Sequence, residues 1–281
     1  MMEYMSQTEI EAYYEKKKRQ NKRFIIASLV LIFGGGLFCL ISLPIGMVFF
    51  LIGWVIAIAF LLSKPFHKLS EIEKPIREAI VGDMMNLDSY QENQKFPEEM
   101  IQETQMYDEW DSYSGGHLTE GRYRTVPVRF CEVRLSHSDY DRDGDSYNVP
   151  DFSGFFLEAT CHHMIQGELR IKKDAVRSFD DLNQEVKENP YRLFKVEEDT
   201  WAEASLLLTD DFMDAVLANE IFYKREMKCL LRGSQVLVAI DNPLFSGGGK
   251  TLDDFKESIQ KDIEFIKYVL DSLIDKTELF R

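Results

Sequence analysis

The longest hydrophobic pattern in the chain is Phe24–Leu62, which runs for about 39 residues without Asp, Glu, Lys or Arg. A membrane-spanning helix needs about 20 apolar residues to cross about 30 Å of hydrocarbon, so this run is long enough for two. Pro44 and Gly46 interrupt its middle, and proline disfavours helix at the residue before it. The pattern therefore predicts a transmembrane hairpin with helices over Phe24–Ile41 and Ile45–Leu62.

Charge predicts how this hairpin is oriented. Basic residues flank it on both sides, whereas its turn at Ser42–Gly46 carries no charge. Because positive residues stay on the cytoplasmic side, we expect both termini inside the cell and the turn outside. A cleaved signal peptide would have a shorter apolar region, of about 7–15 residues. A re-entrant hairpin is the alternative, and it leaves the rest of the chain on the same side.

The segment before the hairpin, residues 1–23, is predicted to be a basic cytosolic helix. Its positive charges would lie against the membrane surface, where each is worth about 1 kcal/mol near anionic lipid headgroups. The candidates for this lipid contact are Lys16, Lys17, Lys18, Arg19, Lys22 and Arg23.

Residues 63–110 have a helical pattern that links the hairpin to the remainder of the chain. Apolar residues recur at helical spacing between positions 66 and 87, which predicts an amphipathic helix. Pro75 would kink or break it. A polar segment over 88–95 and a short helix over 97–110 are expected to follow. We interpret the whole region as a stalk with docking helices.

From residue 117 the period changes to the alternation that is typical of strands. Strands are predicted at 118–123, 125–135, 152–162, 168–172 and 191–196, and a hairpin at 227–231 and 236–240 around the turn 232–235. Ser114–Gly116 is expected to form a turn, and the acidic stretch 136–150 a loop. Residues 180–189 are interpreted as a polar connection or a short helix.

Two helices complete the pattern. Thr209 supplies the cap of one, and Thr251 the cap of a long amphipathic helix over 252–273. The order of helices and strands predicts an α+β domain over 111–281, with a largely antiparallel sheet covered by helices.

Composition narrows the classes of partner. The first 63 residues contain 6 Lys/Arg and 4 Asp/Glu, so the remainder contains 27 and 44 and has a net charge of about −17. Such a surface repels phosphate backbones, which argues against nucleic-acid binding and is compatible with a basic protein partner. The four cysteines make no close-spaced pair, so they are interpreted as buried thiols in a reducing compartment. No cofactor is expected.

Several stretches agree with a known family. They are Tyr113-Ser114-Gly115, Gly121, Phe130-Cys131-Glu132-Val133, Phe152-Ser153-Gly154-Phe155-Phe156, Phe194, Glu203-Ala204, Leu208-Thr209 and Asn242-Pro243-Leu244-Phe245. With them the chain resembles, from roughly Phe24 to Leu273, the domain of unknown function 3137 family of bacterial membrane proteins. The resemblance implies two N-terminal spans and a cytosolic domain at the bacterial inner (cytoplasmic) membrane. It departs at His117, where the family has an acidic residue, and it implies no reaction.

The acidic loop partly matches a calcium-binding pattern. Its candidate ligands are Asp139, Asp141, Asp143 and Asp145. The first three occupy positions one, three and five of an EF-hand loop, but position twelve is Pro150 instead of the bidentate Glu that closes the site. Strands are also predicted on both sides instead of helices. An exposed hairpin loop is therefore the favoured interpretation.

A second partial match is the glycine-rich stretch before the last helix, which ends like a phosphate-binding P-loop. Its candidate residues are Gly248, Gly249, Lys250 and Thr251. The first glycine of the motif would fall at position 244, which is Leu244. A loop that leads into the Thr251 cap explains the same residues.

The remaining candidates are histidines and glutamates. Cys161 and His163 would share one face of a strand, with His162 on the other, so they do not make a complete metal site. Glu132 and Glu158 lie in predicted strands, where they could be buried and catalytic. Pairing with Arg129, Arg134 or Arg170 is the ordinary alternative.

These patterns together predict a membrane-anchored, non-enzymatic accessory or scaffold protein whose cytosolic domain binds a protein partner or a small ligand, or self-associates. One alternative is a membrane-bound enzyme whose carboxylates come together only in the folded chain. The other is an accessory subunit of a transport complex.

Overall fold

The computed structural model describes residues 67–108, 110–141, 145–176, 189–197, 201–244 and 252–281, together with isolated positions between residues 8 and 55. It divides into two compact units, Met1–Ile80 and Val81–Arg281. Among the described residues, no helix is both long and apolar enough to cross a membrane. Most of the predicted hairpin over 24–62 lies outside the described residues.

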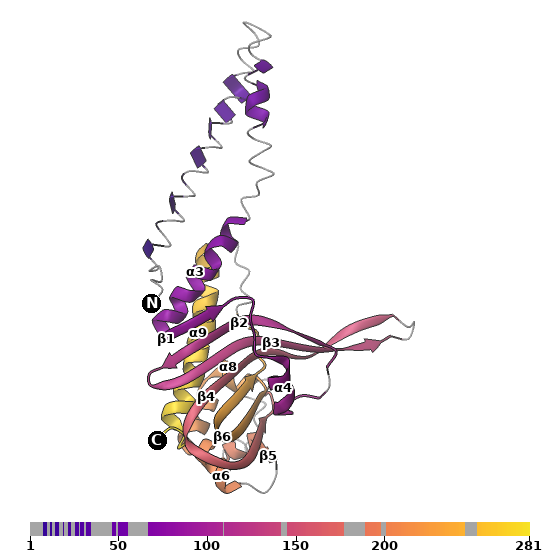
Figure 1. Ribbon diagram of the computed structural model, residues 1–281, viewed down its shortest axis with the longest axis vertical. Helices are drawn as coiled ribbons and strands as arrows, with labels where there is room; N and C mark the ends of the chain where they lie inside the picture. The colour runs from indigo at the N-terminus through magenta and orange to yellow at the C-terminus, as the bar shows by residue number, and fades with distance from the viewer. Residues whose placement is uncertain are drawn as a thin grey trace. The chain divides into compact units, whose positions relative to one another are not determined.

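From residue 67 on, the described helices and strands form an α+β arrangement in which runs of strands and runs of helices follow one another (Figure 1). The elements are α3 (His67–Met84), β1 (Asn86–Gln91), α4 (Glu98–Thr104), β2 (Ser112–Tyr123), β3 (Val126–Tyr140), β4 (Ser146–Lys173), the 3₁₀ helix η1 (Pro190–Leu193), β5 (Phe194–Glu197), α6 (Trp201–Leu207), α7 (Asp210–Ala218), α8 (Glu220–Lys224), β6 (Met227–Ile240) and α9 (Leu252–Lys276).

All described strand pairs are antiparallel, in the order β1-β2-β3-β4-β5 with β6 paired to β4. The predicted α+β class with a largely antiparallel sheet is therefore confirmed.

The centre of the sheet is formed by β4 and β6. The N–H of Asp241, just after β6, donates to the carbonyl of Glu226, just before it, at 3.1 Å. A straight chain of this length would separate these residues by roughly 50 Å, so β6 must fold back on itself. Gly233 has a φ of 58°, the positive value that two-residue hairpin turns use. The hairpin predicted around residues 232–235 therefore lies within β6.

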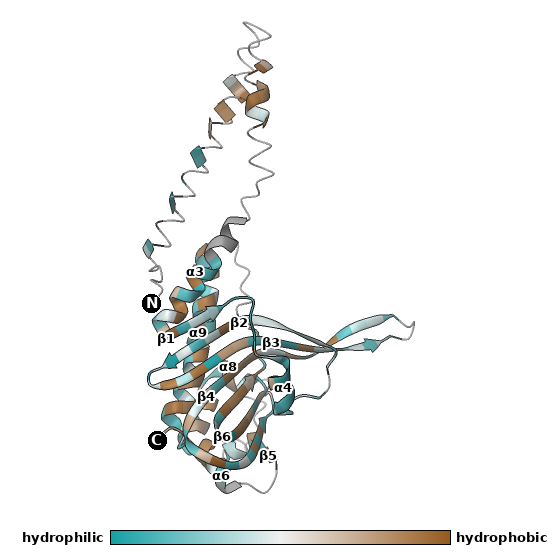
Figure 2. Ribbon diagram, in the orientation of Figure 1, coloured by the Kyte–Doolittle hydropathy of each residue, from teal (hydrophilic) through white to brown (hydrophobic). Residues whose placement is uncertain are grey.

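This fold-back explains the length of β4. Its residues 155–160 pair with 235–240, and its residues 168–173 pair with 227–232. The strand therefore passes along both sides of the β6 hairpin, and the predicted strands at 152–162 and 168–172 are its two parts. Figure 2 shows that β6 is largely hydrophobic, as its central position requires.

Helices cover one face of the sheet. The ring centroid of Phe155 in β4 lies 6.0 Å from that of Phe265 in α9. The ring centroid of Phe222 in α8 lies 6.1 Å from that of the same Phe265. The predicted start of α7 is confirmed, because the Thr209 hydroxyl accepts a hydrogen bond from the Phe212 N–H at 3.2 Å. The long helix α9 is also confirmed, whereas Thr251, its predicted cap, lies outside the described residues.

The opposite face carries α4. Phe156 follows Phe155 in β4 and so points to the other side of the sheet. There it packs in a cluster with Phe96, Ile101 of α4 and Leu237 of β6. The chain before and after α4 thus crosses the sheet face that α9 leaves open.

Some predicted boundaries were wrong. The segment 88–95, predicted only as a polar segment, overlaps the edge strand β1, whose buried residue is Tyr90. Ser114–Gly116 was predicted as a turn but lies inside β2, where a register shift between Gly116 and Thr119 accommodates it. The helix α3 runs through Pro75 without a break. Residues 180–188 lie outside the described residues.

The predicted loop over 136–150 was also wrong in its extent. β3 continues to Tyr140 and β4 begins at Ser146, with paired residues from Ser136↔Pro150 to Tyr140↔Ser146. We call residues 136–141 and 145–150 the arm. Figure 1 shows it projecting from the body of the sheet. Of the described acidic residues, Asp139 therefore lies in the two-stranded ribbon, and Asp141 and Asp145 lie just beyond its last pair.

Candidate binding site beside α4

The two buried glutamates do not form a catalytic pair. Glu132 and Glu158 are 4% and 7% exposed. Glu158 lies opposite Arg129 in the register of β3 and β4. Because Glu132 is three residues along β3 from Arg129, it points to the opposite face of the sheet.

Each glutamate has an arginine partner instead. The Nε of Arg129 donates to Glu158 at 2.6 Å, and the Nη2 of Arg134 donates to Glu132 at 2.6 Å. Gln235 also donates to Glu158, at 2.9 Å. These pairs confirm the ordinary alternative of ion pairing with Arg129 and Arg134.

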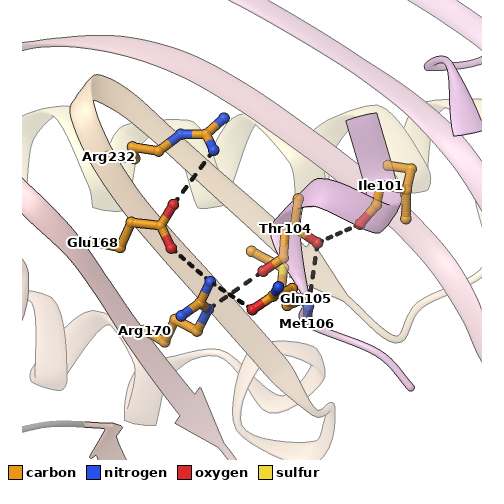
Figure 3. A network of polar contacts seen from close by, with 7 residues as sticks. All are labelled: Ile101, Thr104, Gln105, Met106, Glu168, Arg170 and Arg232. Atoms are coloured by element: carbon orange, nitrogen blue, oxygen red, sulfur yellow. Dashed lines mark hydrogen bonds and ion pairs between the residues drawn. The ribbon is translucent and has the colours of Figure 1, made fainter. Parts of the chain in front are cut away.

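A third group of charges lies where β4 and β6 approach α4. Glu168 lies between Arg170 and Arg232, with oxygen–nitrogen distances of 2.6 and 3.4 Å (Figure 3). The Nε of Arg170 then donates to the carbonyl of Thr104, at the end of α4, over 3.4 Å. Arg170 thus links the sheet to the short helix.

A second cation fixes the chain that follows α4. The Nζ of Lys228 donates to the Met106 carbonyl at 2.6 Å and lies 3.7 Å from the centroid of the Tyr107 ring. Arg170 and Lys228 both meet carbonyl oxygens at or just beyond the helix C-terminus, where positive charge is favourable. Gln105 at the C-cap has a left-handed φ of 51°. The turn that begins the next segment is therefore held in place by the sheet.

Alongside this segment the surface is hollowed. The hollow has a volume of about 680 Å³ and is lined by Gln102, Gln105, Tyr107, Asp108, Trp110 and Asp111. Two aromatic rings, two carboxylates and two amides thus face one space, without a lysine or arginine among the lining residues. Such a lining suits a cationic or hydrogen-bonding group.

Neighbouring contacts fix the aromatic and acidic residues of the hollow. The Tyr107 ring packs 4.8 Å from the ring of Phe152, and the indole N–H of Trp110 donates to Glu98 at 3.0 Å. Burial, with smaller effects from Glu226 and Asp241, raises the pKa of Tyr107 well above its usual value, so its phenol stays neutral.

Asp111 is ionised and held in place at the edge of the hollow. Its carboxylate accepts a hydrogen bond from the Ser138 N–H at 2.6 Å. This bond lowers the pKa of Asp111. The hollow therefore keeps negative charge at physiological pH.

The histidines do not come together as metal ligands. The Nδ1 of His162 lies 2.9 Å from the Phe280 carbonyl, and the thiol of Cys161 donates to the carbonyl of His163. His117 bonds to Tyr90 and His137 to Asp151. In the part of the chain that the structure describes, no group of three or more His, Cys, Asp or Glu is placed to hold a metal ion.

Three of the calcium candidates, Asp139, Asp141 and Asp145, lie at the end of the arm, where β3 ends and β4 begins. Asp139 accepts hydrogen bonds from the Tyr140 N–H at 2.8 Å and the Tyr147 hydroxyl at 3.0 Å. Asp141 accepts one from the Asp145 N–H at 2.9 Å. Asp143 lies outside the described residues. The described carboxylates thus stabilise the turn, as in the hairpin interpretation.

The phosphate-binding candidates cannot be placed in the same way. Gly248, Gly249, Lys250 and Thr251 lie outside the described residues. Only the flanks of this stretch are described: Leu244 is fully buried at one end and Leu252 begins α9 at the other.

Lys173 is a buried cation that sequence analysis did not single out. It is 0% exposed, and its Nζ donates to the carbonyls of Asp174, Tyr223 and Arg225. Burial lowers the pKa of Lys173 to about 8. Its three carbonyl partners and its lack of access to solvent assign it to the core instead of to a site.

Comparison with known families identifies the C-terminal part of the chain. Residues 150–276, from Pro150 within β4 to Lys276 at the end of α9, match the family described as protein of unknown function (DUF3137). This part of the chain belongs to that family. The DUF3137 assignment made from the sequence is thus confirmed over the β4–β6 core and its covering helices. No curated protein and no solved structure matches the chain.

The hollow lies before the matched DUF3137 region, in the segment that sequence analysis treated as a docking helix. Gln102–Asp111 has no motif, and its residues line one hollow because of contacts with distant residues, such as the packing of Tyr107 on Phe152. The one available signal was the two aromatic residues among four acidic ones between positions 103 and 111.

Proposed function

We propose that this chain is a membrane-anchored, non-enzymatic accessory or scaffold protein whose cytosolic domain binds a protein partner in the hollow beside α4. The observation that supports it is the lining of this hollow, which combines the rings of Tyr107 and Trp110 with the carboxylates of Asp108 and Asp111. Lysine and arginine side chains are attracted both to aromatic faces and to carboxylates. The partner segment is therefore cationic.

The placement of the buried carboxylates disfavours the enzyme alternative. A carboxylate-based reaction needs two acidic groups beside one substrate, with different pKa values. Glu132 and Glu158 point to opposite faces of the sheet, and each is bound to an arginine. Binding in the hollow requires neither of them.

Binding to the hollow is tested with a blocked tri-arginine peptide and the full-length protein in a nonionic detergent. Asp108→Asn combined with Trp110→Ala removes one charge and one ring, and we expect it to weaken binding about tenfold, or about 1.4 kcal/mol. Isothermal titration calorimetry measures the affinity. The matched control is Asp214→Asn, which removes the same charge from an exposed position on α7. Equal losses in both variants would show non-specific attraction and refute the site.

The anchor is proposed from the apolar run Phe24–Leu62 and its basic flanks. We propose that it places the protein in the bacterial inner membrane with both termini cytoplasmic, and that Lys16–Arg23 contacts anionic lipid headgroups. A cysteine introduced at Ser42 should react in intact cells with a membrane-impermeant maleimide, whereas one introduced at Arg281 should react only after lysis. The reverse pattern would contradict the proposed orientation.

A further inference from the structure

The arm extends beyond the strand that neighbours it in the sheet. Its two strands pair at five positions, from Ser136↔Pro150 to Tyr140↔Ser146. The neighbouring strand β2 reaches β3 only as far as Ser136, so among the described residues the arm has no third strand. A two-stranded ribbon alone is marginally stable in water. Because the arm projects from the sheet, we expect it to contact another molecule instead of the core (Figure 1).

The side chains of the arm are those of a contact surface. Tyr140 and Tyr147 are 68% and 49% exposed, although large aromatic side chains usually pack against other residues. Tyr147 lies opposite Asp139, so the two tyrosines point to different faces of the ribbon. The described residues of the arm include no lysine or arginine. Exposed rings beside carboxylates repeat the chemistry of the hollow.

The arm and the hollow are joined through one residue. Asp111 lines the hollow, and its carboxylate accepts the Ser138 N–H at 2.6 Å. Its own N–H donates to the Ser136 carbonyl at 3.0 Å. The base of the arm is therefore fixed to the edge of the hollow, and the two acidic aromatic surfaces are continuous.

We infer that the arm is a second binding surface for the same partner, which is an extended lysine- or arginine-rich segment of another protein. The segment enters the hollow with one or more cationic side chains and continues along the ribbon, which is roughly 17 Å long for five paired residues. The acidic ribbon repels anionic lipid headgroups, so a protein segment fits it better than the membrane surface does. This inference rests on the proposed function of the hollow.

The inference predicts that affinity depends on peptide length only when the arm is intact. Blocked tri-arginine and deca-arginine peptides are compared by calorimetry with the full-length protein in a nonionic detergent at 0.15 M salt. In the arm-shortened variant, residues 139–147 are replaced by Asn-Gly, which closes the pair Ser138 and Asn148 with a two-residue turn and keeps the Ser138 N–H that holds Asp111. We expect deca-arginine to bind the wild type at least tenfold more tightly than it binds this variant. The affinity for tri-arginine should be the same for both proteins.

Charge variants keep the arm and separate its chemistry from its fold. Binding of deca-arginine should also weaken by about tenfold in a variant that combines Asp139→Asn, Asp141→Asn and Asp145→Asn. The control is Asp88→Asn, Asp211→Asn and Asp214→Asn, three exposed positions on β1 and α7. If the control variant loses as much affinity for deca-arginine as the arm variant does, the inference is wrong. It is also wrong if the arm-shortened variant keeps the full affinity for deca-arginine. Failure of tri-arginine to bind the wild type would instead refute the proposed hollow.

Discussion

Replacing Gly154 by alanine is expected to destabilise the domain by at least about 3 kcal/mol, because there is no room for a side chain at this position. A Cβ atom on Gly154 would lie 2.0 Å from the carbonyl oxygen of Ile240 and 2.8 Å from the backbone nitrogen of Asn242. Both obstacles are backbone atoms where β6 ends beside β4, so no rotamer change can relieve the contact. Urea unfolding followed by circular dichroism measures the loss.

The matched control is Gly82→Ala. Gly82 lies on the exposed side of α3, and a Cβ there meets nothing within 4 Å. Alanine is favoured over glycine inside a helix, so the free energy of unfolding of this variant should rise by up to about 1 kcal/mol. If Gly154→Ala changed the free energy of unfolding by less than about 1 kcal/mol, the close pairing of β4 with the end of β6 would be wrong.

The second large effect is expected at Lys173. In Lys173→Met the three carbonyl groups of Asp174, Tyr223 and Arg225 lose their shared donor inside the core. Buried carbonyls without a partner cost about 1–3 kcal/mol each, and the removal of a desolvated charge offsets part of that, so we expect a net loss of about 3 kcal/mol. Lys172→Met is the control, since that neighbouring side chain is 38% exposed and should change stability little.

The difference between wild type and Lys173→Met should also depend on pH. The folded-state pKa of Lys173 is about 8, below its ordinary value of 10.5. As pH rises through this window the folded protein loses the proton while the unfolded chain keeps it, so wild-type stability rises relative to the variant by about 1.4 kcal/mol per unit. The comparison with the variant is needed because burial raises the pKa of Cys131 and Cys229 to about 12, which acts in the opposite direction. A constant difference between pH 7 and 10 would contradict the lowered pKa.

The elements that sequence predicted best are those with a complete local signal. α9 has an unbroken hydrophobic stripe, α7 has its Thr209 cap, and the β6 hairpin has Gly233 at its turn. These signals depend on neighbours in the chain and not on the rest of the fold. The α+β class followed from their order.

The features that sequence missed depend on contacts between distant segments. β1 has one buried residue, Tyr90, and its polar composition is explained only by its place at the edge of the sheet. The hollow likewise depends on Phe152, which supports Tyr107 from a strand more than forty residues away. The arm was missed for a different reason, because its pairing is local, from Ser136↔Pro150 to Tyr140↔Ser146, but its residue types are those that favour loops.

The hollow and the arm are proposed to form one surface for a cationic segment. Hydrogen–deuterium exchange of the full-length protein, with and without deca-arginine, tests this proposal most directly. We expect slower exchange at Met106–Asp111 and Ser136–Asp141, with no change in α7 or α9. Protection confined to α7 and α9, or equal protection throughout the domain, would contradict it.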